Sequence, residues 1–246
     1  MNRAGGRSYA WTVAALVLVL VGAYHGSVIP VIATILDKLY SIDLLDIGIL
    51  LSTGSIGGML ASLVAGPLID VTGPRPVLIW SAFGIAFGLL LVALAGSFWS
   101  FFAASIAIAI MFNAISMSLP LYIISLIPDW KRRGFALNLV TGSVPGLFFP
   151  LLVERLIERG SSSLSVVVRA PYAIGAAITF VLFVLFATRS PRTELGIDRE
   201  YGIMDSIRRR MVPVIRSRST WVLVVLISLH SAADTALFQW FPSYPE

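Results

Sequence analysis

The sequence predicts an all-α integral membrane protein, and three features carry that prediction. Hydrophobic residues make up 57% of the 246 residues and charged residues only 13%, whereas a soluble domain carries about 25% charged residues. Several long stretches contain no charged residue, and about 20 apolar residues are enough for a helix to cross the hydrocarbon core. These stretches are too long and too uniformly apolar for the strands of a membrane β-barrel. A soluble domain and a disordered chain are both excluded.

Stretches without a charged residue define the predicted membrane helices. They are residues 8–36, 47–69, 76–128, 134–153 and 170–188, together with residues 219 onward, where His230 and Asp234 interrupt the apolar sequence. The third stretch is long enough for two crossings, and a Gly/Ser-rich turn signal at residues 96–100 divides it. The sequence therefore predicts six complete membrane helices and a seventh near the end of the chain.

Lysine and arginine residues set the predicted orientation, because cytoplasmic loops of membrane proteins carry an excess of both. With the N-terminus in the cytoplasm, most of them fall in the inner segments. The outer loops hold only Lys38, Arg155, Arg159 and Arg169. We therefore expect a multi-pass protein of the plasma or inner cell membrane with a cytoplasmic N-terminus. The formal charge of +5 then reflects topology, and no nucleic-acid partner is predicted.

Residues that bind metals or act as nucleophiles are scarce. The chain has no cysteine and two histidines, His25 and His230, so disulfides, thiolate zinc sites and cysteine nucleophiles are excluded. Neither a metal centre nor a cofactor is predicted. The sequence also shows no convincing cluster of histidine and carboxylate residues at one membrane face, so an integral-membrane enzyme is disfavoured and we do not expect an enzyme.

Small residues recur at a spacing of four in the predicted helices. The second helix carries a stripe of four such residues: Gly54, Gly58, Ser62 and Gly66. The third helix carries the pair Gly84 and Gly88. Helices in lipid associate through close contacts of small residues, so we expect these faces to pack against neighbouring helices, although small residues are also common in membrane helices generally.

The turn between the second and third predicted helices, at residues 66–76, combines several constraints. Asp70 lies near a helix C-terminus, where the helix dipole disfavours an anion, so it needs a compensating partner. Arg75, across the turn, is the nearest candidate. Gly73 can adopt a positive φ, and Pro74 favours the start of the next helix.

This turn resembles the signature G-x-L-x-D-R-x-G-R-R/K of the major facilitator superfamily of secondary transporters. The matching residues are Gly66, Leu68, Asp70, Gly73 and Arg75. Val71 and Pro74 depart from the signature, at positions where the family has basic residues. The turn at residues 128–136, which contains a proline followed by R-G-x-A, is similar to the family's turn between its fourth and fifth helices.

The resemblance implies two six-helix halves joined by a basic loop, with one half rocking against the other. We therefore expect residues 1–189 to form an N-terminal six-helix transmembrane bundle and residues 190–218 a basic cytoplasmic loop. Residues 219–246 would be the first helix of an incomplete second bundle. The predicted fold class is thus a six-helix major-facilitator-type bundle plus a seventh helix, a fragment of a longer transporter. The missing C-terminal half, or a second copy, would complete it within the lipid bilayer.

The resemblance also implies roles for the turn. In the family the signature aspartate helps to hold the outward-facing state through contacts between the halves, so the predicted gating motif is Gly66, Asp70, Gly73 and Arg75. Val71 stands where the family has an arginine. The network of charged contacts that the family forms at this turn would therefore lack one member here. The alternative is that Asp70 and Arg75 form a solvated pair that only sets topology, since exposed ion pairs contribute little.

Four polar residues within apolar stretches are candidates for a path for substrate or protons: His25, Asn113, His230 and Asp234. Ionisable residues at membrane depth are costly unless paired or hydrated. His230 and Asp234 share a helix face and could exchange a proton. The resemblance places the first, fourth and seventh helices around a central cavity, where all four would converge. As alternatives, His25 could be a packing histidine and Asn113 a link between helices.

The sequence therefore predicts a secondary active transporter of a small solute, working by alternating access and coupled to protons. Its expected partners are a small-molecule substrate, protons and lipid. The alternative is a non-transporting membrane protein, a regulatory or assembly partner on the same scaffold.

Overall fold

The computed structural model describes residues 3–158 and 164–191, together with single positions between 208 and 226. Residues 3–158 and 164–191 form helices joined by short turns, without a strand. The helices are α1 (Arg3–Tyr40), α2 (Leu44–Leu51), α3 (Thr53–Thr72), α4 (Pro74–Leu94), α5 (Phe98–Leu126), a 3-10 turn (Pro128–Trp130), α6 (Lys131–Glu158) and α7 (Leu164–Arg189). The predicted all-α fold is confirmed over these residues.

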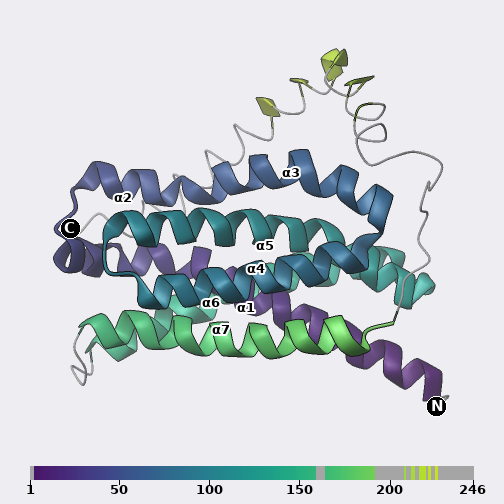
Figure 1. Cartoon of the computed structure of the whole chain (residues 1–246), viewed down its shortest axis with the longest axis horizontal. Coiled ribbons are helices and arrows are strands. Elements are labelled where there is room, and N and C mark those ends of the chain that lie inside the picture. Colours follow the sequence, from purple (N-terminus) through teal and green to yellow (C-terminus); the bar gives the residue numbers. More distant parts are fainter. Residues whose placement is uncertain are drawn as a thin grey trace.

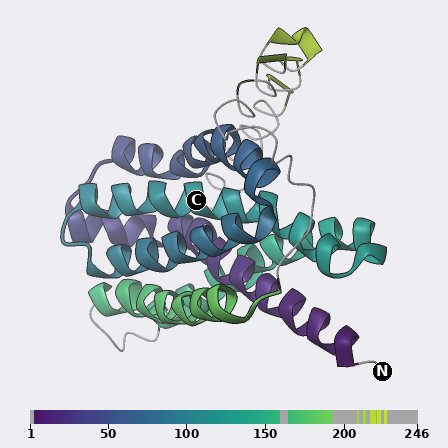
Figure 2. The same ribbon diagram turned by 45° about the vertical axis from the view of Figure 1, so that its right-hand side comes forward.

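The helices form one bundle in which neighbours in space often lie far apart in the chain (Figure 1). α4 packs between α5 and α7, and α3 packs along the other side of α5. α1 packs against α5, α6 and α7 and is the most enclosed of the spanning helices in the described part of the chain. Its first turns project beyond the bundle (Figures 1 and 2).

The described residues contain six helical spans long and apolar enough to cross a membrane. They are Ser8–Ala33, Leu45–Thr72, Pro74–Leu94, Phe98–Leu126, Arg133–Arg155 and Val168–Arg189. Each corresponds to one of the six complete helices predicted from the sequence. The second span comprises α2 and α3, which meet at Ser52 with that residue in helical geometry. The predicted seventh helix, with His230 and Asp234, lies outside the described residues except for single positions.

Local sequence explains where the helices begin and end. Ser97 accepts from the backbone N–H of Ser100 at the start of α5, and the Ser100 hydroxyl accepts in return from the Ser97 N–H, which is a capping box. This divides residues 76–128 at the predicted place. Gly73 ends α3 and precedes α4 with φ 84°, a conformation that favours glycine. Pro74 follows at the start of α4, where a missing N–H costs no helical hydrogen bond.

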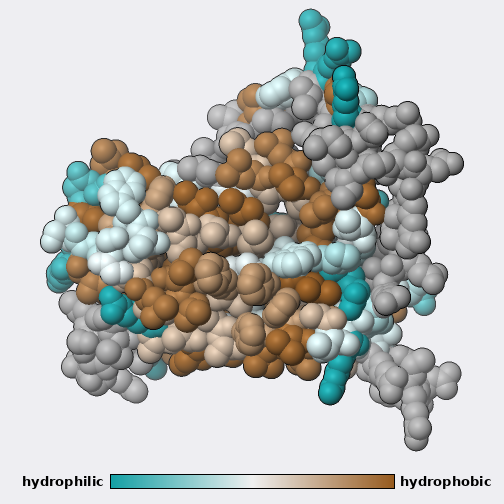
Figure 3. Space-filling model, in the orientation of Figure 1, coloured by the Kyte–Doolittle hydropathy of each residue, from teal (hydrophilic) through white to brown (hydrophobic). Residues whose placement is uncertain are grey.

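The surface of the bundle suits a lipid environment. Figure 3 shows hydrophobic side chains gathered along the middle of the helices, with hydrophilic ones toward their ends. Large apolar side chains are exposed on several helices, among them Leu63, Trp80, Phe87 and Leu139. Such an extent of exposed apolar surface is unusual for a soluble protein and matches helices that face acyl chains.

Glycines pack helices together, and the stripe predicted on the second helix contributes one such contact, at Gly58, where a Cβ would be 3.3 Å from Asn113 Oδ1 of α5. A Cβ at Gly54 or Gly66 would meet nothing within 4 Å, and Ser62 is exposed. The closer contact is made by Gly57, beside the stripe, where a Cβ would overlap Ala109 and its backbone in α5. The expected contacts of Gly84 and Gly88 are confirmed, since their faces lie against Met111 and Ile108 of α5, respectively.

We expect Gly57→Ala to destabilise the bundle by about 1–3 kcal/mol, because the added methyl group would push α3 away from the α5 backbone. Gly54→Ala is the matched control, since its methyl group enters open space and alanine favours a helix by up to about 1 kcal/mol. Thermal unfolding of the two purified variants in detergent would test this. Equal midpoints would contradict the close contact.

Candidate functional site

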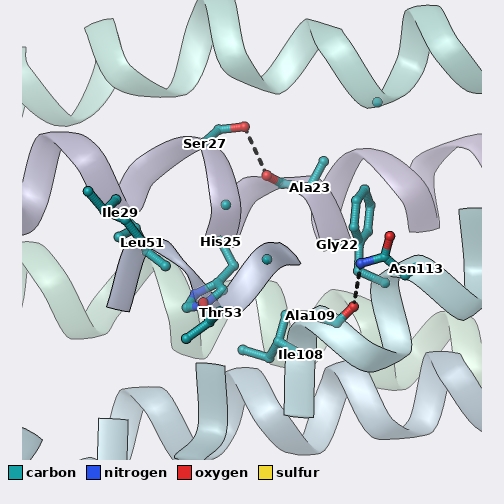
Figure 4. Close-up of a pocket in the computed structure, with 14 residues that line it drawn as sticks. Gly22, Ala23, His25, Ser27, Ile29, Leu51, Thr53, Ile108, Ala109 and Asn113 are labelled. Atoms are coloured by element: carbon teal, nitrogen blue, oxygen red, sulfur yellow. Dashed lines mark hydrogen bonds between the residues drawn. The ribbon is translucent and has the colours of Figure 1, made fainter. Parts of the chain in front are cut away.

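A cavity of about 350 Å³ lies among α1, the α2–α3 junction, α5 and α6. Its wall is mostly apolar and contains four polar side chains: His25, Ser27, Thr53 and Asn113 (Figure 4). None of the side chains that line it in the described part of the chain is an aspartate, glutamate, lysine or arginine. An apolar pocket with a few placed polar groups is typical of a small-molecule site.

His25 is buried in the cavity wall, with 3% of its surface exposed. Its ring nitrogen Nδ1 lies 3.1 Å from the hydroxyl oxygen of Tyr172 in α7. The other ring nitrogen, Nε2, is buried and has no hydrogen-bond partner among the described residues. Leaving a buried polar atom without a partner costs about 1–3 kcal/mol, so Nε2 stands out as a group suited to a ligand.

Aromatic rings hold Tyr172 and His25 in place. The Tyr172 ring, which is fully buried, lies edge-on to Tyr24 at 5.4 Å and to Phe101 at 6.3 Å between ring centroids. Tyr24 in turn lies edge-on to Phe149 of α6 at 4.8 Å. Edge-to-face pairs in this distance range are favourable beyond their buried area. The ring of His25 is therefore fixed by α1, α5 and α7 together.

Asn113 lies near the middle of α5, and its amide Nδ2 donates to the carbonyl of Ala109 in the same helix at 2.8 Å (Figure 4). Its carboxamide also lies beside Gly58 of α3, where a Cβ would be 3.3 Å from Oδ1. Ser27 likewise bonds within its own helix, to the carbonyl of Ala23 at 2.9 Å. Both of these hydrogen bonds stay within one helix, and the carbonyl oxygen and second Nδ2–H of Asn113 make no hydrogen bond with the described residues.

The cavity brings together two of the four predicted path residues, His25 and Asn113. His230 and Asp234 lie outside the described residues. Sequence reasoning missed Tyr172 and Thr53, although both are polar residues within apolar stretches. The signal for Tyr172 in the sequence is its phenol within the uncharged stretch 170–188, as the signal for His25 is its imidazole within residues 8–36.

The predicted gating turn lies at one end of the bundle, and Arg75 connects it to α7. The Arg75 Nε donates to the Ser190 hydroxyl at 2.7 Å, and an Nη donates to the carbonyls of Phe186 and Ala187 at 3.3 and 3.4 Å. Ser190 itself donates to Phe186 at 2.6 Å. The final carbonyls of a helix lack partners and carry partial negative charge, so Arg75 caps α7.

The other members of the turn are placed as the sequence suggested. Gly66 and Asp70 lie in the last two turns of α3 and are half-buried, and Gly73 forms the turn itself. Because the hydrogen bonds of Arg75 go to α7, its role as the partner of Asp70 stays a prediction. What the structure adds is the link between α4 and α7.

Comparison with known proteins identifies the family of the chain. The sequence profile of the Major Facilitator Superfamily matches residues 10–246. The chain belongs to this superfamily. Its members are multi-pass membrane transporters rather than enzymes, so the predicted family, the membrane fold and the absence of an enzyme function are confirmed.

A curated relative within the superfamily is the fujikurins efflux protein of Gibberella fujikuroi (strain CBS 195.34 / IMI 58289 / NRRL A-6831). It is 31% identical to this chain over 105 residues, which cover 39% of this chain and 21% of that protein. The chain thus aligns with about a fifth of the relative's length.

Proposed function

We propose that the protein is a secondary active transporter that moves a small solute across the cell membrane by alternating access, driven by protons. Membership of the superfamily supports transport as such. The observation that carries the proposal is the cavity, which places the unpartnered His25 Nε2 and the Asn113 carboxamide within two membrane spans. Polar groups at that depth mark substrate and ion paths in membrane proteins.

The proposal includes a division of the chain into parts with different roles. Residues 1–189 would form the first six-helix bundle, with its N-terminus in the cytoplasm, and residues 190–218 the cytoplasmic connection. Residues 219–246 would supply the first helix of the second bundle, which would close the cavity from the other side. Gly66, Asp70, Gly73 and Arg75 would form the cytoplasmic gate, where Arg75 already holds the end of α7.

Proton coupling in this proposal rests on the pair His230 and Asp234, which are four residues apart and would share one face of the predicted seventh helix. A carboxylate inside a membrane segment is costly when it is ionised and dry. Binding a proton when the cavity closes, and releasing it when water enters, would link solute movement to the proton gradient. For direction, the name of the fujikurins efflux protein supports export.

Two glycines of α6 provide a test that works before the solute is identified. Gly142 lines the cavity, whereas Gly146, one turn along, does not, and a Cβ at either position would meet nothing within 4 Å. Gly142→Trp would therefore place an indole at the cavity from a position where its Cβ meets no neighbour, and Gly146→Trp is its matched control.

The experiment compares host cells carrying an empty vector, the protein at its natural length, or either tryptophan variant. Mass spectrometry of cell extracts and medium measures how every detectable small molecule divides between them. We expect at least one compound to move in cells with the protein or Gly146→Trp, and Gly142→Trp to fall to the vector level. A protonophore should abolish the difference.

Three outcomes would contradict parts of the proposal. If the protein and the vector give the same distribution of every compound, the non-transporting regulatory or assembly protein becomes the better interpretation. If a compound moves equally well with the protonophore present, transport stands and proton coupling is wrong. Equal activity of both tryptophan variants would remove the cavity from the transport path.

A further inference from the structure

The hydrogen bond between Tyr172 and His25 determines which ring nitrogen of the histidine carries the hydrogen. In a neutral imidazole one nitrogen donates and the other accepts. If the Tyr172 hydroxyl donates to Nδ1, the hydroxyl hydrogen is satisfied and the ring hydrogen sits on Nε2. The reverse arrangement would leave the buried hydroxyl hydrogen without an acceptor among the described residues. The first arrangement leaves fewer buried groups unpaired and is therefore favoured.

The neutral ring is also the form that this environment favours. The bond to Tyr172 is the one hydrogen bond of the His25 side chain within the described part of the chain, and Phe101 and Tyr172 pack beside the ring. Burying an imidazolium without an anion beside it is costly. His25 lines the cavity and keeps a neutral Nε2–H donor, closed to solvent, that has no acceptor within the described residues.

The other polar groups of the cavity complement this donor. Asn113 donates one Nδ2–H to Ala109, which leaves its carbonyl oxygen as an acceptor and its second Nδ2–H as a donor. Thr53, 2% exposed, adds a hydroxyl to the wall. The lining side chains of the described residues carry no formal charge, so nothing on this wall would neutralise a charged group of a solute.

We propose that the Nε2–H of His25 donates a hydrogen bond to an acceptor oxygen of the transported solute, a carbonyl or ether oxygen of an uncharged organic molecule. Tyr172 is the positioning residue that holds His25 in the donating tautomer. This proposal rests on the proposed transport function and specifies the chemistry that its cavity recognises.

The tautomer is measurable without transport. The full-length protein is labelled with 15N-histidine and placed in lipid nanodiscs, and NMR distinguishes protonated from bare ring nitrogens. Because the chain has two histidines, a His25→Gln spectrum identifies the His25 signals by subtraction. We expect a protonated Nε2 and a bare Nδ1. Protonation of Nδ1 in the unmodified protein would overturn the proposal.

Tyr172→Phe tests the positioning role, because it removes the hydroxyl and keeps the ring. We expect a mixture of the two His25 tautomers in this variant. Tyr122→Phe is the matched control, since Tyr122 is equally buried and packs instead on Phe186 near the Arg75 contact, and it should leave the His25 spectrum unchanged. An unchanged spectrum in Tyr172→Phe would overturn the positioning role.

Two probes of similar shape test the acceptor preference: cyclohexanone, which has a carbonyl oxygen, and methylenecyclohexane, which lacks it. Titration of the Nε2 signal should show about tenfold tighter binding of cyclohexanone. Equal binding of both probes, or binding of neither, would overturn the acceptor site. Since these readouts do not depend on solute movement, a failed transport experiment with the expected NMR result would count against the proposed function alone.

Discussion

Arg75→Gln is expected to destabilise the protein by about 2–3 kcal/mol, because the charged guanidinium would no longer hold the end of α7. Arg75 supplies hydrogen bonds to Ser190, Phe186 and Ala187, and hydrogen bonds from a charged donor are among the strongest in proteins. In a protein of this size such a loss lowers the midpoint of thermal unfolding by about 4–12 °C. Thermal unfolding in detergent measures it.

Two further variants sharpen the Arg75 experiment. Arg75→Lys keeps the charge but loses the planar fork that reaches several oxygens at once, so its midpoint should fall between those of the original protein and Arg75→Gln. Arg189→Gln removes an exposed arginine at the end of the same helix and should change the midpoint little. If Arg75→Gln unfolds at the same temperature as Arg189→Gln, the cap contributes nothing to stability.

The Arg75 cap on α7 also has a consequence for the proposed cytoplasmic gate at residues 66–76. Arg75 lies in the second position of α4, directly after the turn at Gly73, while its partners end α7. Residues 190–218, the proposed connection between the halves, begin at Ser190. If α7 moves when the transporter switches between its inward-facing and outward-facing states, either the Arg75 hydrogen bonds break or α4 moves together with α7. The motif at residues 66–76 would thus act on the connecting segment as well as on the opposite half.

The membrane spans and their ends could be predicted from the sequence because local chemistry sets them. The length of an uncharged stretch determines whether it can cross lipid. Ser97 starts a helix and Gly73 ends one through contacts and backbone angles within their own turns. The family could be recognised for a similar reason, since its signature lies within residues 66–76. His25 and Asn113 stand out in the sequence as polar groups within apolar stretches, and both line the cavity.

Contacts between distant parts of the chain could not be predicted. The His25–Tyr172 bond joins residues 147 positions apart, and the Arg75–Ser190 bond joins residues 115 apart. No sequence pattern around His25 or Arg75 indicates which distant residue it contacts. Which glycine of α3 makes the closest helix contact could not be predicted either, because glycine is tolerated both at the cavity wall, as at Gly54, and against α5. Gly57, outside the stripe, makes the closest contact with α5 among the α3 glycines.

Asp234→Asn is expected to reduce proton-driven transport by about 100-fold, the upper end of ordinary coupling between two ligands. Asparagine keeps the size and hydrogen-bonding capacity of the side chain but cannot bind and release a proton. Exchange of labelled for unlabelled solute at equal pH on both sides needs no net proton movement, so it should continue in the variant. Asp37→Asn, which changes an exposed carboxylate at the end of α1 beyond the membrane span, is the control and should behave like the original protein.

The comparison of driven transport with exchange separates two roles for Asp234. Loss of both activities would mean that the carboxylate binds the solute or supports the fold, and it would contradict the proposed role of Asp234 as a proton carrier. Retention of both would place the proton elsewhere, with His230 as the next residue to change. Loss of driven transport alone fits one mechanism. In it, His25 and Asn113 hold the solute from the first bundle, while Asp234 on the facing helix carries the proton.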